Sequence, residues 1–158
     1  MAAGRDRSVG KNFTRKLKSD KSLDEDHIVL MQTAGVIEPC DNTVIPYAIG
    51  YRSTLDKFQN SVGKETFNTG ADINAETACF RSGWAEIPLD IDHAAIAIGD
   101  MIIVGPADIG KVIKGDSTDI AEFLRRVGWA EETVAVPGGG LRTKDTVLVA
   151  LDIQGGAP

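Results

Sequence analysis

The sequence has few of the residues on which the chemistry of small proteins usually depends. Its 158 residues include two cysteines, two histidines and nine aromatic side chains (five Phe, two Trp and two Tyr). Two cysteines cannot form a disulfide framework, and no zinc-ligand spacing is present. A catalytic set built on histidine would need His27 or His93, and neither lies near a recognisable nucleophile. We therefore expect that the protein is not an enzyme and that it holds no metal or cofactor.

Long apolar runs are also missing. The longest, Ala94–Val104, is interrupted by Gly99 and Asp100 and falls short of the roughly 20 residues that span a bilayer. The N-terminus is charged and contains no apolar signal segment. We expect a soluble protein, made in the cytoplasm, without a membrane partner. Cys40 and Cys79 are expected to be small core residues, although the sequence leaves their pairing open.

A strong charge asymmetry runs along the chain. Residues 1–21 carry seven bases and two acids, a net charge of +5, whereas the other 137 residues carry ten bases and 21 acids, a net charge of −11. The first 26 residues contain few apolar side chains and cannot bury enough surface to fold alone. We therefore predict a basic, extended N-terminal arm over residues 1–26 and one β-rich domain over residues 27–158. Basic arms typically contact an acidic protein, a nucleic acid or an anionic surface.

From residue 27 onward the pattern is mostly that of strands. Short runs rich in Ile and Val are bounded by Gly, Pro, Asn and Asp. The expected strands lie near His27–Gln32, Thr43–Tyr51, Thr77–Phe80, Trp84–Leu89, Met101–Val104, Gly110–Lys114, Gly128–Val136 and Thr146–Ile153. The polar segment 56–74 is expected to be a long loop or a hairpin tip. The fold class is therefore mainly β: a compact β-barrel or β-sandwich with one short helix and the extended N-terminal arm.

One segment has the periodicity of a helix. Its apolar side chains recur at the spacing of one helical face: Ile120, Phe123, Leu124 and Val127. Asp119 is a suitable N-cap, with Glu122 three residues further on, and Gly128 can end the helix. We expect this short helix to plug one end of the barrel or sandwich.

Residues 105–112, Gly-Pro-Ala-Asp-Ile-Gly-Lys-Val, nearly match the phosphate-binding loop of nucleotide-binding proteins. Val112 stands where that loop has the hydroxyl residue that contacts magnesium, and Gly115 with Asp116 would break the helix that should follow. A β-hairpin turn is therefore the better interpretation. Acidic residues beside histidine in 24–27 and 90–93 are expected to form solvated turns, with a bound divalent cation as the less favoured alternative.

Four segments combine an apolar strand with a glycine in a recurring pattern: Ala48–Tyr51, Ser82–Leu89, Ala97–Val104 and Val127–Glu131. A fifth segment, Val147–Leu151, is a closing apolar strand. In this pattern the sequence resembles the small capsid decoration (cement) proteins of tailed viruses of bacteria and archaea. The likeness covers roughly residues 43 to 153 and rests on strands and turns rather than on reactive groups. The basic arm and the helix near 119–127 are not part of it.

The resemblance implies a compact β domain on the outer capsid surface of a virion. Such proteins sit as trimers, or as other homo-oligomers, over junctions between subunits of the major capsid protein and brace the shell. We hypothesise that the arm lies on the capsid, where its bases pair with acidic residues and its apolar side chains fill shallow pockets. The predicted contact residues are Arg5, Arg7, Lys11, Phe13, Arg15, Lys16, Leu17 and Lys18.

Two other functions stay open at this stage. The protein can be a different virion component, such as a tail or head–tail joining protein, or a non-enzymatic module whose basic arm binds nucleic acid. The few aromatic residues do not interleave with basic ones to form a stacking surface for bases. Nucleic acid is therefore not the expected partner.

Overall fold

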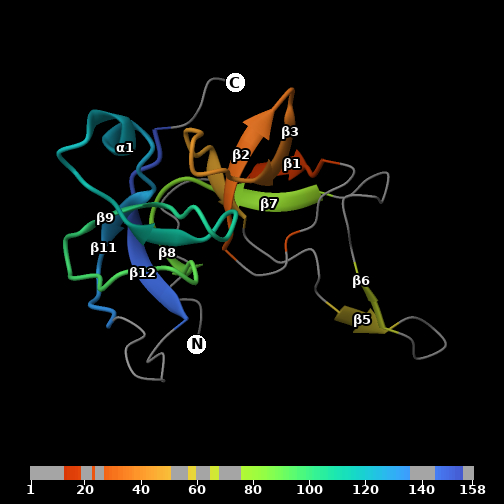
Figure 1. Cartoon of the computed structure of the whole chain (residues 1–158). Helices are drawn as coiled ribbons and strands as arrows, with labels where there is room; N and C mark the ends of the chain where they lie inside the picture. The colour runs from red at the N-terminus through yellow and green to blue at the C-terminus, as the bar shows by residue number, and fades with distance from the viewer. Residues whose placement is uncertain are drawn as a thin grey trace.

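The computed structural model describes residues 13–18, 23, 27–50, 57–59, 65–67, 76–135 and 145–154, and two five-stranded antiparallel sheets make up most of this part (Figure 1). The first sheet has the order β1 (Phe13–Lys16), β7 (Glu76–Phe80), β4 (Ala48–Gly50), β2 (Val29–Thr33) and β3 (Val36–Pro39). The second has the order β10 (Val112–Lys114), β9 (Met101–Val104), β11 (Gly128–Ala130), β12 (Thr146–Leu151) and β8 (Trp84–Pro88). A separate hairpin, β5 (Lys57–Gln59) with β6 (Glu65–Phe67), and helix α1 (Ile120–Leu124) are the other described elements. The mainly β fold class predicted from the sequence is confirmed.

Each five-stranded sheet curls until its two edge strands meet at one point. In the first sheet Leu17, directly after β1, forms an isolated parallel bridge with Ile37 of β3. In the second sheet Leu89, directly after β8, forms the same kind of bridge with Val112 of β10. Neither bridge extends into a continuous ladder among the described strands. The arrangement is therefore compatible with a sandwich-like fold, and the described strands do not form the closed barrel that the sequence left as the alternative.

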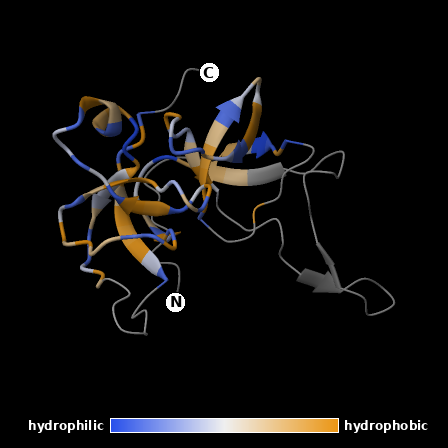
Figure 2. Cartoon of the chain, viewed as in Figure 1, coloured by the Kyte–Doolittle hydropathy of each residue, from blue (hydrophilic) through white to orange (hydrophobic). Residues whose placement is uncertain are grey.

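The central strands of the first sheet are buried on both faces. Successive residues of a strand point to opposite sides, so Leu30 and Cys79 belong to a cluster made by the first sheet and its flanking segments, whereas Val29 and Phe80 belong to a larger cluster shared by both sheets. In Figure 2, β9 and most of β12 are drawn in apolar colours, and β2 is apolar at its start and hydrophilic at its end. The shared cluster joins the two sheets into one body.

The described part of the predicted arm, residues 13–18 and 23, is built into the first sheet and its core. Strand β1 pairs with β7 from Phe13 opposite Cys79 to Lys16 opposite Glu76. Leu17 and Leu23 are buried, at 5% and 0% exposed, in the first-sheet cluster. Phe13, Leu17 and Leu23 of the arm thus help to cover one face of the first sheet. A segment that cannot fold alone can still pair with the edge of a sheet, as β1 does with β7.

The other predicted strands lie where the structure has strands, but several of the predicted segments are longer than the strands themselves. The eight expected segments contain or overlap β2, β4, β7, β8, β9, β10, β11 and β12, and the polar segment 56–74 contains the β5–β6 hairpin. Strand β3 was not predicted, because its four residues include a glutamate and a proline. It lies at a sheet edge, where a proline costs no ladder hydrogen bond.

Helix α1 begins as predicted but does not plug the core. The Asp119 carboxylate accepts hydrogen bonds from the backbone N–H groups of Ala121 and Glu122, as an N-cap should. The helix ends at Leu124, before Gly128, which already belongs to β11. None of its residues is buried, so the expected plug is wrong. No helix among the described residues is long and apolar enough to cross a membrane.

We predict that Gly128→Ala strongly destabilises the protein. A Cβ at this position would overlap the backbone carbonyl oxygen of Ala150, on the neighbouring strand β12. Backbone cannot move away as a side chain can, so we expect a loss at the upper end of the roughly 1–3 kcal/mol typical of overpacking. Urea unfolding of both variants measures this, with Gly50→Ala as the control, because the closest atom to its Cβ would be the end of the flexible Leu23 side chain at 3.1 Å, and its other contacts, from 3.4 Å outward, are ordinary. Equal stability of the two variants would contradict this account.

We predict that Cys40 and Cys79 do not react with thiol reagents in the folded protein. Neither forms a disulfide and both are fully buried, and burial raises the pKa of each thiol to about 12. At pH 8 only about one such thiol in 10⁴ is the reactive thiolate. Labelling with a chromogenic disulfide should therefore follow global unfolding, and should reach two thiols per chain in urea. Rapid labelling without denaturant would show that one of the two sites opens locally.

Candidate functional site

The segment that resembles a phosphate-binding loop is a hairpin closed by a carboxylate of the protein itself. It joins β9 to β10, as the hairpin interpretation predicted. The fully buried Asp90 places its Oδ2 at 3.0 Å from the backbone nitrogen of Ala107 and 2.8 Å from that of Asp108. Gly105 passes so close to this carboxylate that a Cβ would overlap it. The amides that would hold a phosphate are therefore already used, and no helix follows them.

The acidic turn at 90–93 is also satisfied internally. Asp90 Oδ1 accepts from the backbone nitrogen of Asp92 at 2.8 Å, and Asp108 Oδ2 accepts from that of Ile91 at 3.0 Å. His93 is buried, with Nδ1 at 3.0 Å from the carbonyl oxygen of Ala94. Within the described residues, no group of three or more His, Cys, Asp and Glu side chains is placed to hold a metal ion. The turn fastens the β9–β10 hairpin to the end of β8.

Aromatic and guanidinium groups anchor β1 on the first sheet. The Phe13 ring lies edge-on to Tyr47, with 5.9 Å between centroids. The Arg81 guanidinium lies 4.1 Å from the Tyr47 centroid and 5.3 Å from that of Phe13, and Arg15 lies 5.0 Å from Phe13 on its own strand. Cation–π contacts of this kind contribute about 0.5–2 kcal/mol each. The start of β1 is therefore a fixed attachment point for the residues that precede it.

The structure divides the eight predicted contact residues into three groups. Arg5, Arg7 and Lys11 lie outside the described residues. Phe13, Arg15 and Leu17 contact the protein's own first sheet, and Lys18 forms an ion pair with Glu38 at 3.2 Å. Lys16 is exposed. Phe13 and Leu17 are thus engaged within the fold, which is a different use from the expected filling of pockets on a capsid.

An exposed apolar helix face is the feature that the sequence did not reveal. Ile120 is 78% exposed, Leu124 52% and Phe123 38%. The periodicity of these residues correctly indicated a helix, but it could not show that the face would point outward. Contiguous apolar surface on a small soluble protein usually marks a protein–protein contact.

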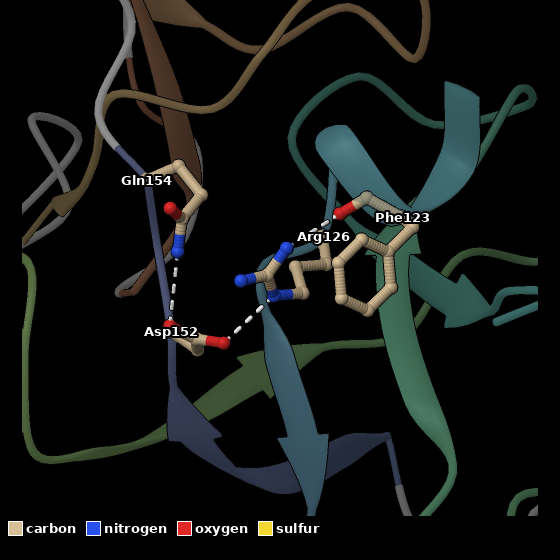
Figure 3. Close-up of polar contacts among 4 residues, drawn as sticks. All are labelled: Phe123, Arg126, Asp152 and Gln154. Atoms are coloured by element: carbon tan, nitrogen blue, oxygen red, sulfur yellow. Dashed lines mark hydrogen bonds and ion pairs between the residues drawn. The ribbon is translucent and has the colours of Figure 1, made fainter. Parts of the chain in front are cut away.

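Polar contacts, rather than apolar burial, hold this helix in place. Arg126, only 9% exposed, lies just after the helix (Figure 3). Its Nε donates to Asp152 Oδ2 at 2.7 Å, and its Nη1 donates to the Phe123 carbonyl oxygen at 2.8 Å. The guanidinium also stacks on the Phe123 ring at 4.2 Å from its centroid. Gln154 Nε2 donates to the other oxygen of Asp152 at 3.1 Å.

A second arginine links the helix to the first sheet. Arg125 donates from Nε to the carbonyl oxygen of Ala121 at 3.1 Å, and from Nη1 to that of Asn42. Asn42 belongs to the loop between β3 and β4, where Val44 and Ile45 are also exposed, at 38% and 41%. The contact therefore brings two exposed apolar segments, one from each half of the molecule, next to each other.

An open hollow of about 520 Å³ adjoins the helix. Its lining includes Met101, Trp129, Lys114 and three carboxylates, those of Asp100, Asp116 and Glu122. Lys114 already pairs with Asp100 at 3.1 Å. A hydrogen bond from the Ala97 amide, with a smaller contribution from Lys114, lowers the pKa of Asp100, and hydrogen bonds from Thr118 lower the pKa of Asp116. The hollow therefore presents ionised carboxylates beside aromatic and apolar side chains.

The comparisons with known proteins add no relative to this picture. No protein-family model matches the chain, and no curated protein matches it.

We predict that Arg126→Met loosens helix α1 while the sheets stay folded. The variant keeps an apolar stem but loses the hydrogen bonds to Asp152 and Phe123. Losing about 1–2 kcal/mol of local stability corresponds to a five- to thirtyfold rise in amide exchange. Hydrogen exchange at the Phe123 and Arg125 amides measures this. Gln154→Ala, which removes only the outer hydrogen bond to Asp152, should leave the exchange unchanged, and slow exchange in both variants would contradict the role assigned to Arg126.

Proposed function

We propose that this protein is a structural component of a virion: a decoration protein that binds the outer surface of an icosahedral shell and bridges subunits of the major capsid protein. The observation that carries the proposal is the exposed apolar face of α1, with Ile120 78% and Leu124 52% exposed, held rigid by Arg125 and Arg126. A fixed apolar surface on a small β protein suits a permanent protein partner. The likeness of its strand and glycine pattern to decoration proteins supports the same function.

The basic N-terminal segment contributes electrostatic contact in this proposal. Arg5, Arg7 and Lys11 precede the fixed start of β1, and exposed Lys16 lies on that strand. Each exposed ion pair with an acidic shell residue contributes only about 0–1 kcal/mol. A homo-oligomer, for which we propose a trimer, multiplies such weak contacts because each further arm binds at a high effective concentration. Phe13 and Leu17 are left out of the contact, since the first sheet already uses them.

The test is gradient sedimentation of particles assembled with and without this chain. We expect the protein to migrate with the particles, at a copy number comparable with that of the major shell protein. A copy number far below it would point to a tail or head–tail joining component. Failure to migrate with particles, together with salt-sensitive binding to DNA, would replace the proposal with the nucleic-acid module.

Deletion of residues 1–12 tests the basic segment separately. The cut leaves β1, Leu17 and Leu23 in place, so the first sheet should keep its fold. We expect weaker particle binding and a smaller dependence on salt, because three bases are lost. The double variant Arg5→Lys with Arg7→Lys keeps the charge and should bind like the unmodified protein. Unchanged salt dependence after the deletion would exclude a contact by this segment.

A further inference from the structure

The hollow beside α1 has the chemistry of a receptor for a basic segment. Three carboxylates line it, whereas its one ammonium group, that of Lys114, is neutralised by Asp100. Trp129 gives the lining an aromatic surface on which a guanidinium can stack. Phe123 lies edge-on to Trp129, with 6.4 Å between ring centroids, so the exposed helix face adjoins the hollow. A fitting ligand therefore combines positive charge with small apolar groups.

The carboxylates of this hollow are held in position before any ligand arrives. Glu122 Oε2 accepts from the backbone nitrogen of Asp116 at 2.6 Å. Asp116 Oδ1 accepts from the nitrogen of Thr118 at 2.9 Å and from its hydroxyl at 2.7 Å. Fixed side chains lose little conformational entropy on binding. The loop after β10 and the first turn of α1 therefore form a preorganised acidic rim.

The chain itself contains a segment with the matching chemistry. Residues 1–12 carry three bases against one acid, together with Met1, Val9 and small residues. Two acidic bodies of charge −11 repel each other when their hollows face directly, whereas a segment of opposite sign attracts the next body. Twelve extended residues reach up to about 40 Å. The segment is thus long enough to leave its own molecule.

The position of its attachment favours a neighbour over the same molecule. Strand β1 is an edge strand of the first sheet, and α1 lies beside the second sheet on the other side of the molecule (Figure 1). Copies placed side by side would bring the start of β1 in one copy towards α1 in the next. From these observations we infer that residues 1–12 of one copy dock in the hollow lined by Asp116, Glu122 and Trp129 on a neighbouring copy. The inference rests on the proposed function only in taking copies to lie side by side.

Cross-linking between two differently labelled preparations tests the inference. One preparation carries Ser8→Cys, which keeps every base of the segment, and the other carries Ser117→Cys in the hollow. They are mixed, both as free protein and on particles, with a short bis-maleimide. We expect a mixed cross-link several times more frequent than with Ile109→Cys, a residue that is 59% exposed on a loop outside the lining. The buried native thiols serve in every sample as the unreactive background.

Charge variants show whether the docking is electrostatic. The mixed cross-link should fall several-fold when Arg5→Glu and Arg7→Glu are added to the Ser8→Cys chain, and should survive Arg5→Lys with Arg7→Lys. It should also fall when salt rises from about 0.1 M to 1 M, which shortens the screening length from about 10 Å to 3 Å. A mixed cross-link whose yield changes neither with the Arg→Glu substitutions nor with the salt concentration would overturn the inference.

The remaining outcomes separate the inference from the proposed function. A mixed cross-link no more frequent than the Ile109→Cys control overturns the inference. So does a cross-link from position 8 to the shell protein alone. A third preparation carries Ser8→Cys and Ser117→Cys in one chain, and a cross-link found only within that single chain also overturns the inference. If any of these occurs while the copy number on particles is normal, the inference fails and the proposed function stands. If the mixed cross-link forms in free protein that does not bind particles, the proposed function fails and the inference stands.

Discussion

The burial of the first sheet on both faces is the constraint on which the rest of the structure depends. Val29, Ile49 and Phe80 on one face join the cluster shared with the second sheet, so the opposite face needs a cover of its own. Leu17 and Leu23, from the basic N-terminal region, supply part of that cover. A region that the composition marks as an extension is therefore required by the core. Among its described basic residues, Lys16 is exposed on a strand whose position the core fixes.

The sequence was sufficient to predict most of the strands, because apolar alternation and glycine turns are local signals. Strand β1 was not predicted, since its alternation is carried by Phe13, Arg15 and Leu17, and an arginine in that series hides the pattern. Arg15 fits at this position because its guanidinium stacks on the Phe13 ring instead of being buried without a partner. Only the pairing with β7, more than sixty residues away, makes the segment a strand.

The candidate site could be predicted only in part. The bases of the N-terminal segment and the helix periodicity are visible in the sequence, but the side of the helix that faces the core depends on Arg125 and Arg126 and their partners Asn42 and Asp152. The hollow is likewise assembled from several separate segments between Ala94 and Trp129, which only the fold brings together. The segment that resembles a phosphate loop also could not be interpreted fully from its own residues. Asp90, which accepts hydrogen bonds from the backbone amides of this segment, lies outside the motif.

The two parallel bridges, Leu17 to Ile37 and Leu89 to Val112, affect how copies of the protein can associate at high local concentration. An open sheet normally offers a row of unpaired backbone groups along each border, and matching borders on other copies can add to it without limit. Here the two borders of each sheet bend towards each other and meet at one bridge, so a strand of another copy cannot pair along the whole length of either border. Copies of such a protein can lie close together with less tendency for their sheets to join edge to edge.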